Sequence, residues 1–380
     1  MSWKTTKLGD VLTIQNGYAF DSKSFSNSDG TPLIRIRDLK NGVETKTNYN
    51  GMYDDKFLVN AGDLLIGMDG EFGCFEWKGK ASLLNQRVCR LMDFSNQLLP
   101  RFLFYGINQY LKEIESKTVF ITVKHISSKQ IKDISFPIPS LPVQKQIVEK
   151  LDAAFTDIDK AISATKKNIE NVEDLFQKFL FSIFTKENEN SILPHFNEIL
   201  TKTNEYKFQE CLVKTKTPKK LKKREYLKEG KFPVVAQEVD MINGYSNDEN
   251  LLFEVEDKVI IFGDHTRHLK LIDFNFVIGA DGVKIIKTID EINTDYFYYY
   301  LLGLMPESRG YARHYKLLKD LIFQIPSLPV QKQIVEKIDY LYKKTKKLVS
   351  INEYKLLEFR NLKSSILEQA FLEEFTKDAA

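Results

Sequence analysis

The densest group of residues that could do chemistry is a basic run between Lys214 and Lys231. Only two acidic residues, Glu225 and Glu229, oppose it. Its basic members are Lys214, Lys216, Lys219, Lys220, Lys222, Lys223, Arg224, Lys228 and Lys231. Cations at this density neutralise phosphates, which is the basis of sequence-independent binding to nucleic acid. In an arbitrary protein the commoner meaning is a solvated, mobile loop. The two-headed organisation described below makes us prefer phosphate binding, with DNA contacts predicted at Lys216, Lys219, Lys220, Lys222, Lys223 and Arg224.

Two further groups carry donors that read base edges. Asn85, Gln86 and Arg87 are consecutive in the first half of the chain, and the second half has a similar inventory. That second set is Gln237, His265, Arg267 and His268. Asn and Gln bind adenine, and Arg binds guanine, through paired hydrogen bonds in the major groove. For the first group, a tight turn in which these side chains satisfy backbone groups is an equally good interpretation.

A third arginine pair lies near the start of the chain. Arg35 and Arg37 alternate with Ile34 and Ile36, so the pattern predicts that the two arginines share one face of a strand. That face is either a DNA surface or the solvent-facing side of the sheet.

A basic residue next to a histidine occurs once in each half. Lys124 and His125 lie in TVKHIS, and Arg313 and His314 lie in ARHYK. Allowing a two-residue gap, both pairs precede a repeated segment by a similar distance. Cationic and ring N–H donors reach phosphates or base edges. One such pair is weak evidence, and its recurrence is what makes us predict DNA contacts here.

Catalytic, cofactor and metal signals are poor. The chain has no NPPY or DPPY sequence for amino-methylation of a base, no GxGxxG after a strand and no GxxxxGK[ST]. Glu256 and Lys258 form an ExK of the kind seen in nucleases, but a chain this rich in Glu and Lys contains several by chance. His265 and His268 lack companions at zinc spacing. We therefore predict no catalytic residues, no cofactor and no metal.

A repeat organises the rest of the chain. Ile138–Asp152 reads IPSLPVQKQIVEKLD and Ile325–Asp339 reads IPSLPVQKQIVEKID, so the copies differ at one position. The Ser and Pro residues at the head of each copy are typical of a helix N-terminus. Apolar residues then follow at alternating spacings of three and four, which indicates a helix that pairs along a seam. From Val143 to about Lys186 such a helix would extend roughly 65 Å.

The partner of each helix is predicted to be the other copy, lying antiparallel to it. The seam on the first helix is Ile147, Leu151, Phe155, Ile158, Ile162, Ile169, Val172, Phe176, Phe179 and Ile183. On the second it is Ile334, Ile338, Thr345, Val349, Leu356, Phe359, Ile366 and Ala370, reinforced by Leu341, Leu348 and Leu362. As spacer and partner-binding residues we assign Gln144, Ile147, Leu151, Gln331, Ile334 and Ile338.

The expected fold class is α+β, with two globular domains separated by two long antiparallel helices that form a coiled coil with an approximate internal twofold. We expect a first globule over residues 1–140, a helix over 141–186, a connector over 187–206, a second globule over 207–327 and a second helix over 328–376. The segment FITVKHISSKQIKDISFPIP is expected to be strand or loop, and TDYFYYYLLGLM a helix. Two unlike heads on one scaffold suit a DNA site made of two unlike halves.

The composition limits the possible functions and the cellular location of the chain. The formal charge is only +3, because 55 basic residues nearly cancel 52 acidic ones, so net charge alone does not argue for nucleic acid. Three scattered cysteines and a polar start, MSWKTTKLGD, predict a reducing, cytoplasmic location. A membrane role is not expected, since LFQKFLFSIF is interrupted by polar residues.

The repeat, the globule-helix layout and the approach segment together resemble the specificity subunit of a Type I restriction-modification system over essentially the whole chain. The PxLPxQxxI pattern from Pro139 and again from Pro326 is the most distinctive mark, and NGYAF (16–20) and LNQRV (84–88) are similar to first-domain motifs of that family. The chain departs from it at Val143 and Val330, where the family commonly has Glu.

The resemblance implies two target-recognition domains, each reading one half of an interrupted duplex DNA sequence. It implies partners that this chain lacks: two modification subunits that carry S-adenosylmethionine and methylate adenine, and ATP-driven restriction subunits. A coiled-coil adaptor whose globules bind proteins is the alternative, and a self-sufficient modification enzyme is a third possibility. The near-identity of the repeat also suggests that such genes exchange domains by recombination at this repeat. Widely divergent codons in the two copies, with no neighbouring partial copies at the locus, would count against exchange.

Overall fold

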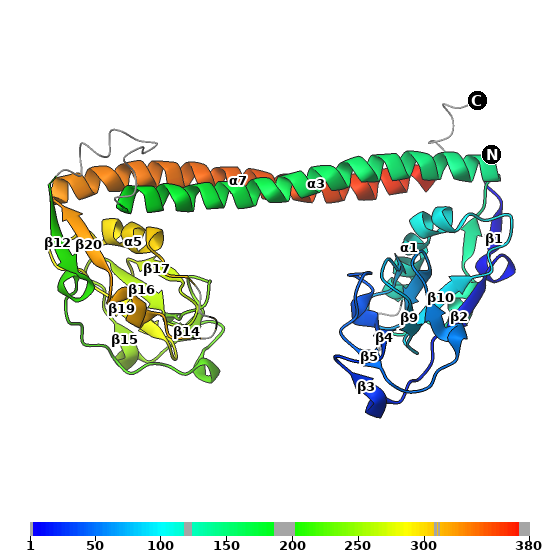
Figure 1. The fold of residues 1–380 in the computed structure, drawn as a ribbon, viewed down its shortest axis with the longest axis horizontal. Coiled ribbons are helices and arrows are strands. Elements are labelled where there is room, and N and C mark those ends of the chain that lie inside the picture. The colour runs from blue at the N-terminus through cyan, green and yellow to red at the C-terminus, as the bar shows by residue number, and fades with distance from the viewer. Residues whose placement is uncertain (1–2, 118–123, 186–201, 308–309, 311, 372–380) are drawn as a thin grey trace. The chain divides into compact units, whose positions relative to one another are not determined.

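The computed structural model describes residues 3–117, 124–185, 202–307, 310 and 312–371, and divides the chain into two compact units (Figure 1). Unit 1 comprises residues 1–163 with 356–380, and unit 2 comprises residues 164–355. Each unit therefore holds one globular head and a part of both long helices. The expectation of a connector over 187–206 falls largely outside the described residues, and its residues 203–206 belong to a strand of the second head, because they pair with residues 323–326.

The head of unit 1 is built from short strands. A four-stranded sheet has the order β2-β10-β7-β8, a five-stranded one the order β3-β5-β4-β9-β6, and β1 pairs with β11. The strands are β1 (Thr5–Lys7), β2 (Thr13–Asn16), β3 (Phe25–Ser26), β4 (Thr31–Ile34), β5 (Asn48–Tyr49), β6 (Leu58–Val59), β7 (Leu64–Gly67), β8 (Gly73–Glu76), β9 (Ser82–Leu84), β10 (Val88–Met92) and β11 (Ser135–Pro137). Helix α1 (Pro100–Lys117), the short α2 (Ser128–Lys132) and 3-10 turns complete it.

The head of unit 2 repeats this plan with different side chains. Its sheets have the orders β14-β13-β18-β15 and β17-β16-β19, and β12 pairs with β20. The strands are β12 (Thr203–Lys207), β13 (Phe232–Val235), β14 (Gly244–Ser246), β15 (Leu252–Phe253), β16 (Val259–Gly263), β17 (Leu269–Ile272), β18 (Phe276–Ile278), β19 (Val283–Ile286) and β20 (Ile322–Pro326). Helix α5 (Thr294–Gly303), as expected, and the short α6 (Tyr315–Leu318) follow the strands.

Hydrogen bonds make the internal repeat explicit. In unit 1 the parallel pair β4/β9 joins Ile34 to Leu84, and in unit 2 the parallel pair β13/β18 joins Val235 to Ile278. The N–H of Leu8 donates to Ile134 O in the first head, and the N–H of Phe208 donates to Leu321 O at the same place in the second. The two heads therefore share a topology, which confirms the duplicated α+β plan.

The two predicted long helices are confirmed as α3 (Leu141–Phe184) and α7 (Leu328–Phe371). The carbonyl oxygens of Ser140 and Ser327 accept the N–H groups of Gln144 and Gln331 at their first turns. In both helices Pro occupies the second position, where its missing N–H costs nothing.

Within each unit the two helices run antiparallel. In unit 1 the beginning of α3 packs against the end of α7, where Lys363 forms an ion pair with Asp159. In unit 2 the end of α3 packs against the beginning of α7, with the rings of Phe176 and Tyr342 centred 5.4 Å apart. Ile158 and Phe176 are buried and Thr345 and Val349 are half-buried, as a seam requires.

The proposed reinforcement of this seam was wrong. Leu341, Leu348 and Leu362 are 36%, 48% and 46% exposed, so they face away from the helix pair. Leu is favourable anywhere on a helix, and spacing alone does not tell a second apolar face from a widened first one.

Each head packs on both long helices through one large core. In unit 1, Phe102 of α1 and Phe136 of β11 lie against Ile147 of α3 and Phe371 of α7. Gly106 of α1 allows this approach, because a Cβ atom there would overlap the Phe371 ring. Unit 2 builds an equivalent core from α5, β20, the end of α3 and the start of α7.

Candidate nucleic-acid interface

The two motifs singled out in the first head lie side by side. Backbone N–H groups of Gly17 and Tyr18 donate to Val88 O and Leu84 O, and that of Gln86 donates to Tyr18 O. Gly17 is required for this contact, because a Cβ atom at that position would collide with the backbone of Asn85. The two segments thus cross where residues 17–18 bond to residues 84–88, and we call this place the crossing. It exposes residues 85–87 directly after β9.

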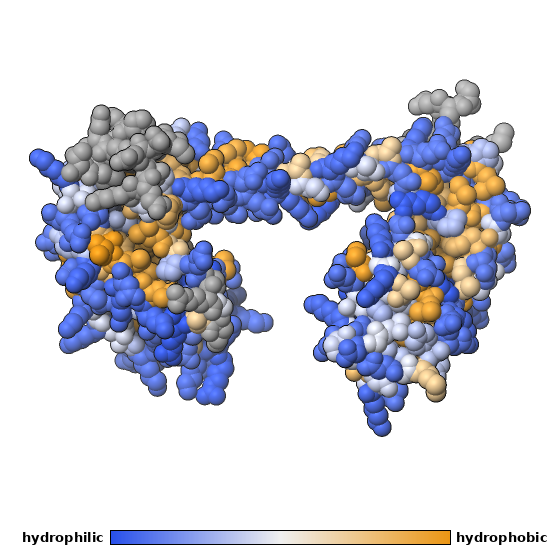
Figure 2. Space-filling model, viewed as in Figure 1, coloured by the Kyte–Doolittle hydropathy of each residue, from blue (hydrophilic) through white to orange (hydrophobic). Residues whose placement is uncertain are grey.

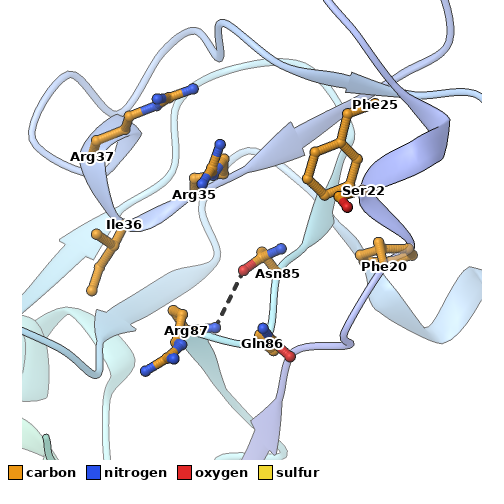
Figure 3. Close-up of a pocket in the computed structure, with 9 residues that line it drawn as sticks. All are labelled: Phe20, Ser22, Phe25, Arg35, Ile36, Arg37, Asn85, Gln86 and Arg87. Carbon is orange, nitrogen blue, oxygen red and sulfur yellow. Dashed lines mark hydrogen bonds between the residues drawn. The ribbon is translucent and has the colours of Figure 1, made fainter.

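Five predicted DNA-contacting residues line one open pocket of about 480 Å³ beside this crossing. They are Arg35, Arg37, Asn85, Gln86 and Arg87, and the remaining lining residues are Phe20, Ser22, Phe25 and Ile36. Figure 3 shows the arginines on one side of this space and the two phenylalanines on the other. Hydrogen-bond donors converge here beside apolar side chains, and such donors can bind a base edge.

The local structure around the arginines differs from the prediction. β4 ends at Ile34, and Arg35 precedes a 3-10 turn, η3 (Ile36–Asp38), so the two arginines do not share a strand face. The Asp38 carboxylate closes this turn by accepting the N–H of Arg35 at 2.9 Å. Both arginines nevertheless line the pocket, because Arg35 and Arg37 lie at the start of this turn and within it.

Hydrogen-bonding capacity remains free in this pocket. Among the residues that the structure describes, neither the Arg35 guanidinium nor the Gln86 amide has a side-chain hydrogen-bond partner. Arg37 Nη2 donates to Thr47 Oγ1 at 3.0 Å, which directs its planar group but leaves other N–H groups available. Asn85 Oδ1 accepts the backbone N–H of Arg87 at 3.4 Å, a weak version of the turn predicted as the alternative.

An acidic residue that the sequence did not single out organises the next part of the surface. Asp69 accepts from Arg87 through one carboxylate oxygen, and its other oxygen lies 2.6 Å from His125 Nδ1. Arg87 and His125 are half-exposed, while Asp69 is largely buried. The carboxylate thus brings together two predicted DNA contacts that are far apart in sequence.

Lys124 points elsewhere. Its ammonium group forms an ion pair with Glu115 of α1 at 2.9 Å, and this hydrogen bond lowers the pKa of the Glu115 carboxyl. The other Glu115 oxygen accepts the N–H of Phe72. Residues 122–123 of TVKHIS lie outside the described part of the chain, so only Lys124 to Ser127 are placed.

In unit 2 the basic run occupies the place that NGYAF occupies in unit 1. Leu221 forms a parallel bridge to Gly279 and its N–H donates to Ile278 O, as Tyr18 bridges Asn85 and donates to Leu84 O. Lys219, Lys222, Lys223 and Arg224 are exposed around this crossing. The run therefore folds over the carboxyl ends of a parallel strand pair instead of forming an isolated loop.

Individual members of the run differ in their availability. Lys223 is paired with Glu238 at 3.0 Å, and Lys216 lines a separate pocket whose lining includes Glu254, Glu256 and Asp257. Lys220 donates to Val283 O at 2.8 Å, and burial lowers its pKa. Lys222 and Arg224 have no side-chain ion pair among the described residues, which makes them the most available for phosphates.

Two of the base-reading candidates in unit 2 lie together. Gln237 follows β13 and its Oε1 accepts the backbone N–H of His265, which follows β16, at 3.2 Å. Lys270 anchors the adjacent loop, since its buried ammonium group donates to Ala236 O at 2.8 Å and to Asn243 Oδ1 at 3.1 Å. Burial lowers the pKa of Lys270. The sequence did not indicate this residue, because the residues around a lysine in the sequence do not show whether its side chain is buried.

Arg267 and His268 sit in the turn between β16 and β17. Arg267 has a φ of 62°, and its Nη1 donates to Pro306 O at 2.8 Å. That contact directs the guanidinium toward its own head. His268 is exposed.

The structure argues against a DNA contact from His314. The His314 side chain is 0% exposed. The backbone N–H of His314 donates to Asp264 O, and in the first head the backbone N–H of Ile126 donates to Met68 O in the same way. His314 thus takes the place of a buried isoleucine, and the exposed Arg313 corresponds to His125. The sequence comparison, which allowed a two-residue gap, matched His125 with His314 and was therefore wrong by one residue.

The six residues assigned to the spacer and to partner binding are also inaccessible. Gln144, Ile147, Leu151, Gln331, Ile334 and Ile338 are each 0% exposed. The four apolar ones belong to the cores that join each head to its long helix. These residues hold each head on its long helix. Because they are buried, a docking protein would contact other side chains.

Other candidate chemistry is accounted for by ordinary ion pairs. Lys258 contacts both carboxylate oxygens of Asp295 at 2.7 and 2.9 Å, and Glu256 pairs with Lys287 at 2.9 Å, so the ExK residues do not face each other. No group of three or more potential metal-ligating side chains occurs in the described residues. In the same part of the chain, none of the helices has the length and apolar character needed to cross a membrane.

A family model described as the Type I restriction modification DNA specificity domain matches this chain twice, at residues 1–173 and 201–358. The chain belongs to this family. It is 28% identical to the Type I restriction enzyme EcoBI specificity subunit of Escherichia coli over 99% of this chain and 86% of the relative. It is 24% identical to the putative type I restriction enzyme MjaX specificity subunit of Methanocaldococcus jannaschii over 87% of this chain and 84% of the relative. A solved chain from work on assembly of the type I R-M system has the same fold, with a TM-score of 0.68 at 18% identity and 97% coverage of both chains.

Proposed function

We propose that this chain is the sequence-specific DNA-binding subunit of a Type I restriction-modification complex, and that it supplies recognition without catalysis. Each head reads one half of an interrupted duplex site. The observation that carries the proposal is the convergence of Arg35, Asn85, Gln86 and Arg87 in one pocket beside a motif crossing. The second head has a basic run at the corresponding crossing.

We propose the domain limits from this division of work. Residues 1–140 and 207–327 form the first and second recognition domains, and residues 141–186 and 328–376 form the spacer helices. Residues 187–206 connect the halves, and the last four of them also begin strand β12 of the second head. The proposed interface consists of the exposed candidates, including His268 and Arg313, and omits His314 because of its burial.

The proposed protein partners are two modification subunits, with restriction subunits joining them. An exposed apolar stripe on α7 in unit 2 supports a docking role for the helices. Its members are Tyr340 (61%), Leu341 (36%), Leu348 (48%), Ile351 (41%) and Tyr354 (63%). Figure 2 shows apolar surface along the helix pair where Figure 1 labels α7. Large apolar side chains exposed together on one helix are a usual mark of a protein interface.

Changing both Leu348 and Ile351 to Glu is therefore expected to weaken binding of the modification subunit on the order of tenfold or more, because charges replace the centre of an apolar interface. Co-purification and sedimentation of the complex measure this loss. Met52→Glu is the control, since Met52 is 98% exposed in a loop of unit 1 and does not belong to either long helix. Unchanged assembly of the double variant would remove the stripe from the interface.

Binding to duplex DNA at several salt concentrations tests the function against the adaptor alternative. A DNA-binding subunit loses affinity steeply as salt rises, with about 0.9 units of slope per phosphate contact. Lys222→Ala with Arg224→Ala is expected to reduce the slope by about 1.8. Lys287→Ala is the control, because Glu256 already neutralises that lysine. A shallow slope in the unaltered chain would favour the adaptor.

A further inference from the structure

The buried glutamine of the repeat joins each long helix to the helix of its own head. Gln144 Nε2 donates to Pro139 O at 2.8 Å and to Gln97 O at 2.7 Å, and its Oε1 accepts the N–H of Leu99 at 2.9 Å. Gln97 and Leu99 lie immediately before α1. The side-chain amide thus uses both donors and its oxygen, and two of these three bonds hold the start of the head's helix.

Unit 2 repeats this arrangement atom for atom. Gln331 Nε2 donates to Pro326 O at 2.8 Å and to Glu291 O at 2.9 Å, and its Oε1 accepts the N–H of Asn293 at 2.7 Å. Glu291 and Asn293 lie immediately before α5. The contacts recur although the head residues involved are different, because two of the three partners are backbone groups of the head.

A second contact lies eight residues further along each long helix. Asp152 accepts the hydroxyl of Tyr105, and Asp339 accepts the hydroxyl of Tyr299 at 2.5 Å. Each tyrosine is the sixth residue of its helix, α1 or α5. Burial and the neighbouring carboxylate raise the pKa of both tyrosines, so both remain protonated donors.

Gln144 with Asp152 and Gln331 with Asp339 are separated by about 12 Å along their helices, at 1.5 Å per residue. Between the two polar contacts lie buried apolar residues of the repeat. Apolar contact is not directional, so alone it allows one helix to turn or slide on another. Hydrogen bonds have strict distance and angle requirements, and an unsatisfied buried amide is costly.

We infer that each Gln–Asp pair of the repeat is a two-point clamp that fixes the pose of a recognition domain on its long helix, and that the four residues are positioning residues for discrimination of the spacing between half-sites. This inference rests on the proposed function. It also assigns a reason to the near-identity of the repeat, whose last residue is the clamp aspartate. Head-specific contacts differ. Arg101 donates to Asp152 Oδ1 through Nε at 3.0 Å and Nη2 at 2.8 Å, and Nη2 also donates to the Tyr105 hydroxyl at 3.2 Å. Asp295, at the matching position of α5, pairs with Lys258 instead.

The test uses Tyr105→Phe, Tyr299→Phe and the double variant in the full chain with its modification subunits. Each change removes one hydroxyl and keeps the ring. Tyr299→Phe removes the bond to Asp339 alone, whereas Tyr105→Phe removes the bond to Asp152 and the one that the hydroxyl accepts from Arg101 Nη2. Affinity is measured for duplexes with the cognate spacing and with one base pair more or fewer, once methylation mapping has identified the site. Tyr110→Phe on α1 and Tyr298→Phe on α5 are matched controls, since neither hydroxyl has a hydrogen-bond partner among the described residues.

The clamp predicts that preference for the cognate spacing over the altered ones falls about fivefold in each single variant and further in the double variant, the scale of one buried hydrogen bond. Base preferences within each half-site and the controls stay unchanged. An unchanged spacing preference would overturn the inference. An equal loss of affinity at all spacings, together with a lower Tm, would overturn it as well. Absence of any preference for a bipartite site in the unaltered chain would overturn the proposed function as well.

Discussion

Changing Gln86 to Ala is expected to relax base discrimination at one position of the first half-site by roughly 5- to 150-fold, the equivalent of about 1–3 kcal/mol for a bidentate contact. Gln86 lines the open pocket and its amide has no partner among the described side chains. An amide held ready at that point has one donor and one acceptor to offer an adenine edge. Arg35→Ala is expected to act in the same half-site, at guanine or at a phosphate.

The measurement is competition binding against duplexes that carry each single substitution in the first half-site. Gln109→Ala is the control, because Gln109 is exposed on α1 of the same unit and makes no side-chain hydrogen bond to a described residue. Discrimination should change in the first half-site only. A uniform loss of affinity at every position would assign Gln86 to backbone contact, and no change would remove the pocket from base recognition.

Inserting seven residues at matching places in α3 and α7 is expected to abolish binding to the natural site or to move preference to a longer spacer. Seven residues lengthen a helix by about 10.5 Å, which is close to three base pairs at about 3.4 Å each. A whole heptad keeps the seam in register, so the helix pair should still form. Selection from duplexes with graded spacers measures the result, and an insertion in α3 alone provides the mismatched control. An unchanged spacer preference would show that the helices are not the ruler.

The sequence predicted best what local patterns determine. The repeat and its three-and-four spacing predicted both long helices, because an apolar stripe that long needs a partner helix. The donor set at residues 85–87 and the arginines at 35 and 37 were found by residue type, and the structure brings them into one pocket. Their DNA contacts stay predictions.

The errors came where tertiary contacts decide. Ser127 caps α2 through a capping box with Gln130, a short-range signal that was present in a segment expected to be strand or loop. Asp69 escaped notice because its partners, Arg87 and His125, are distant in sequence. His314 was misjudged since nothing local distinguishes a buried histidine from an exposed one.

The glutamines of the repeat show the same limit. Gln144 and Gln331 are polar residues on a helix surface, and polar residues there are usually solvated. Only the fold reveals that backbone groups of each head surround them. The Leu341, Leu348 and Leu362 positions are the converse case, since apolar residues assigned to a seam lie exposed.

Exchange of the first head tests the central claim, that two independent heads read two half-sites, most directly. Residues 1–140 are replaced by the corresponding domain of a related specificity subunit, and methylation of the host genome is mapped with the original and the hybrid chain. We predict that one half of the methylated sequence changes while the other half is retained. Alteration of both halves, or of neither, would contradict it.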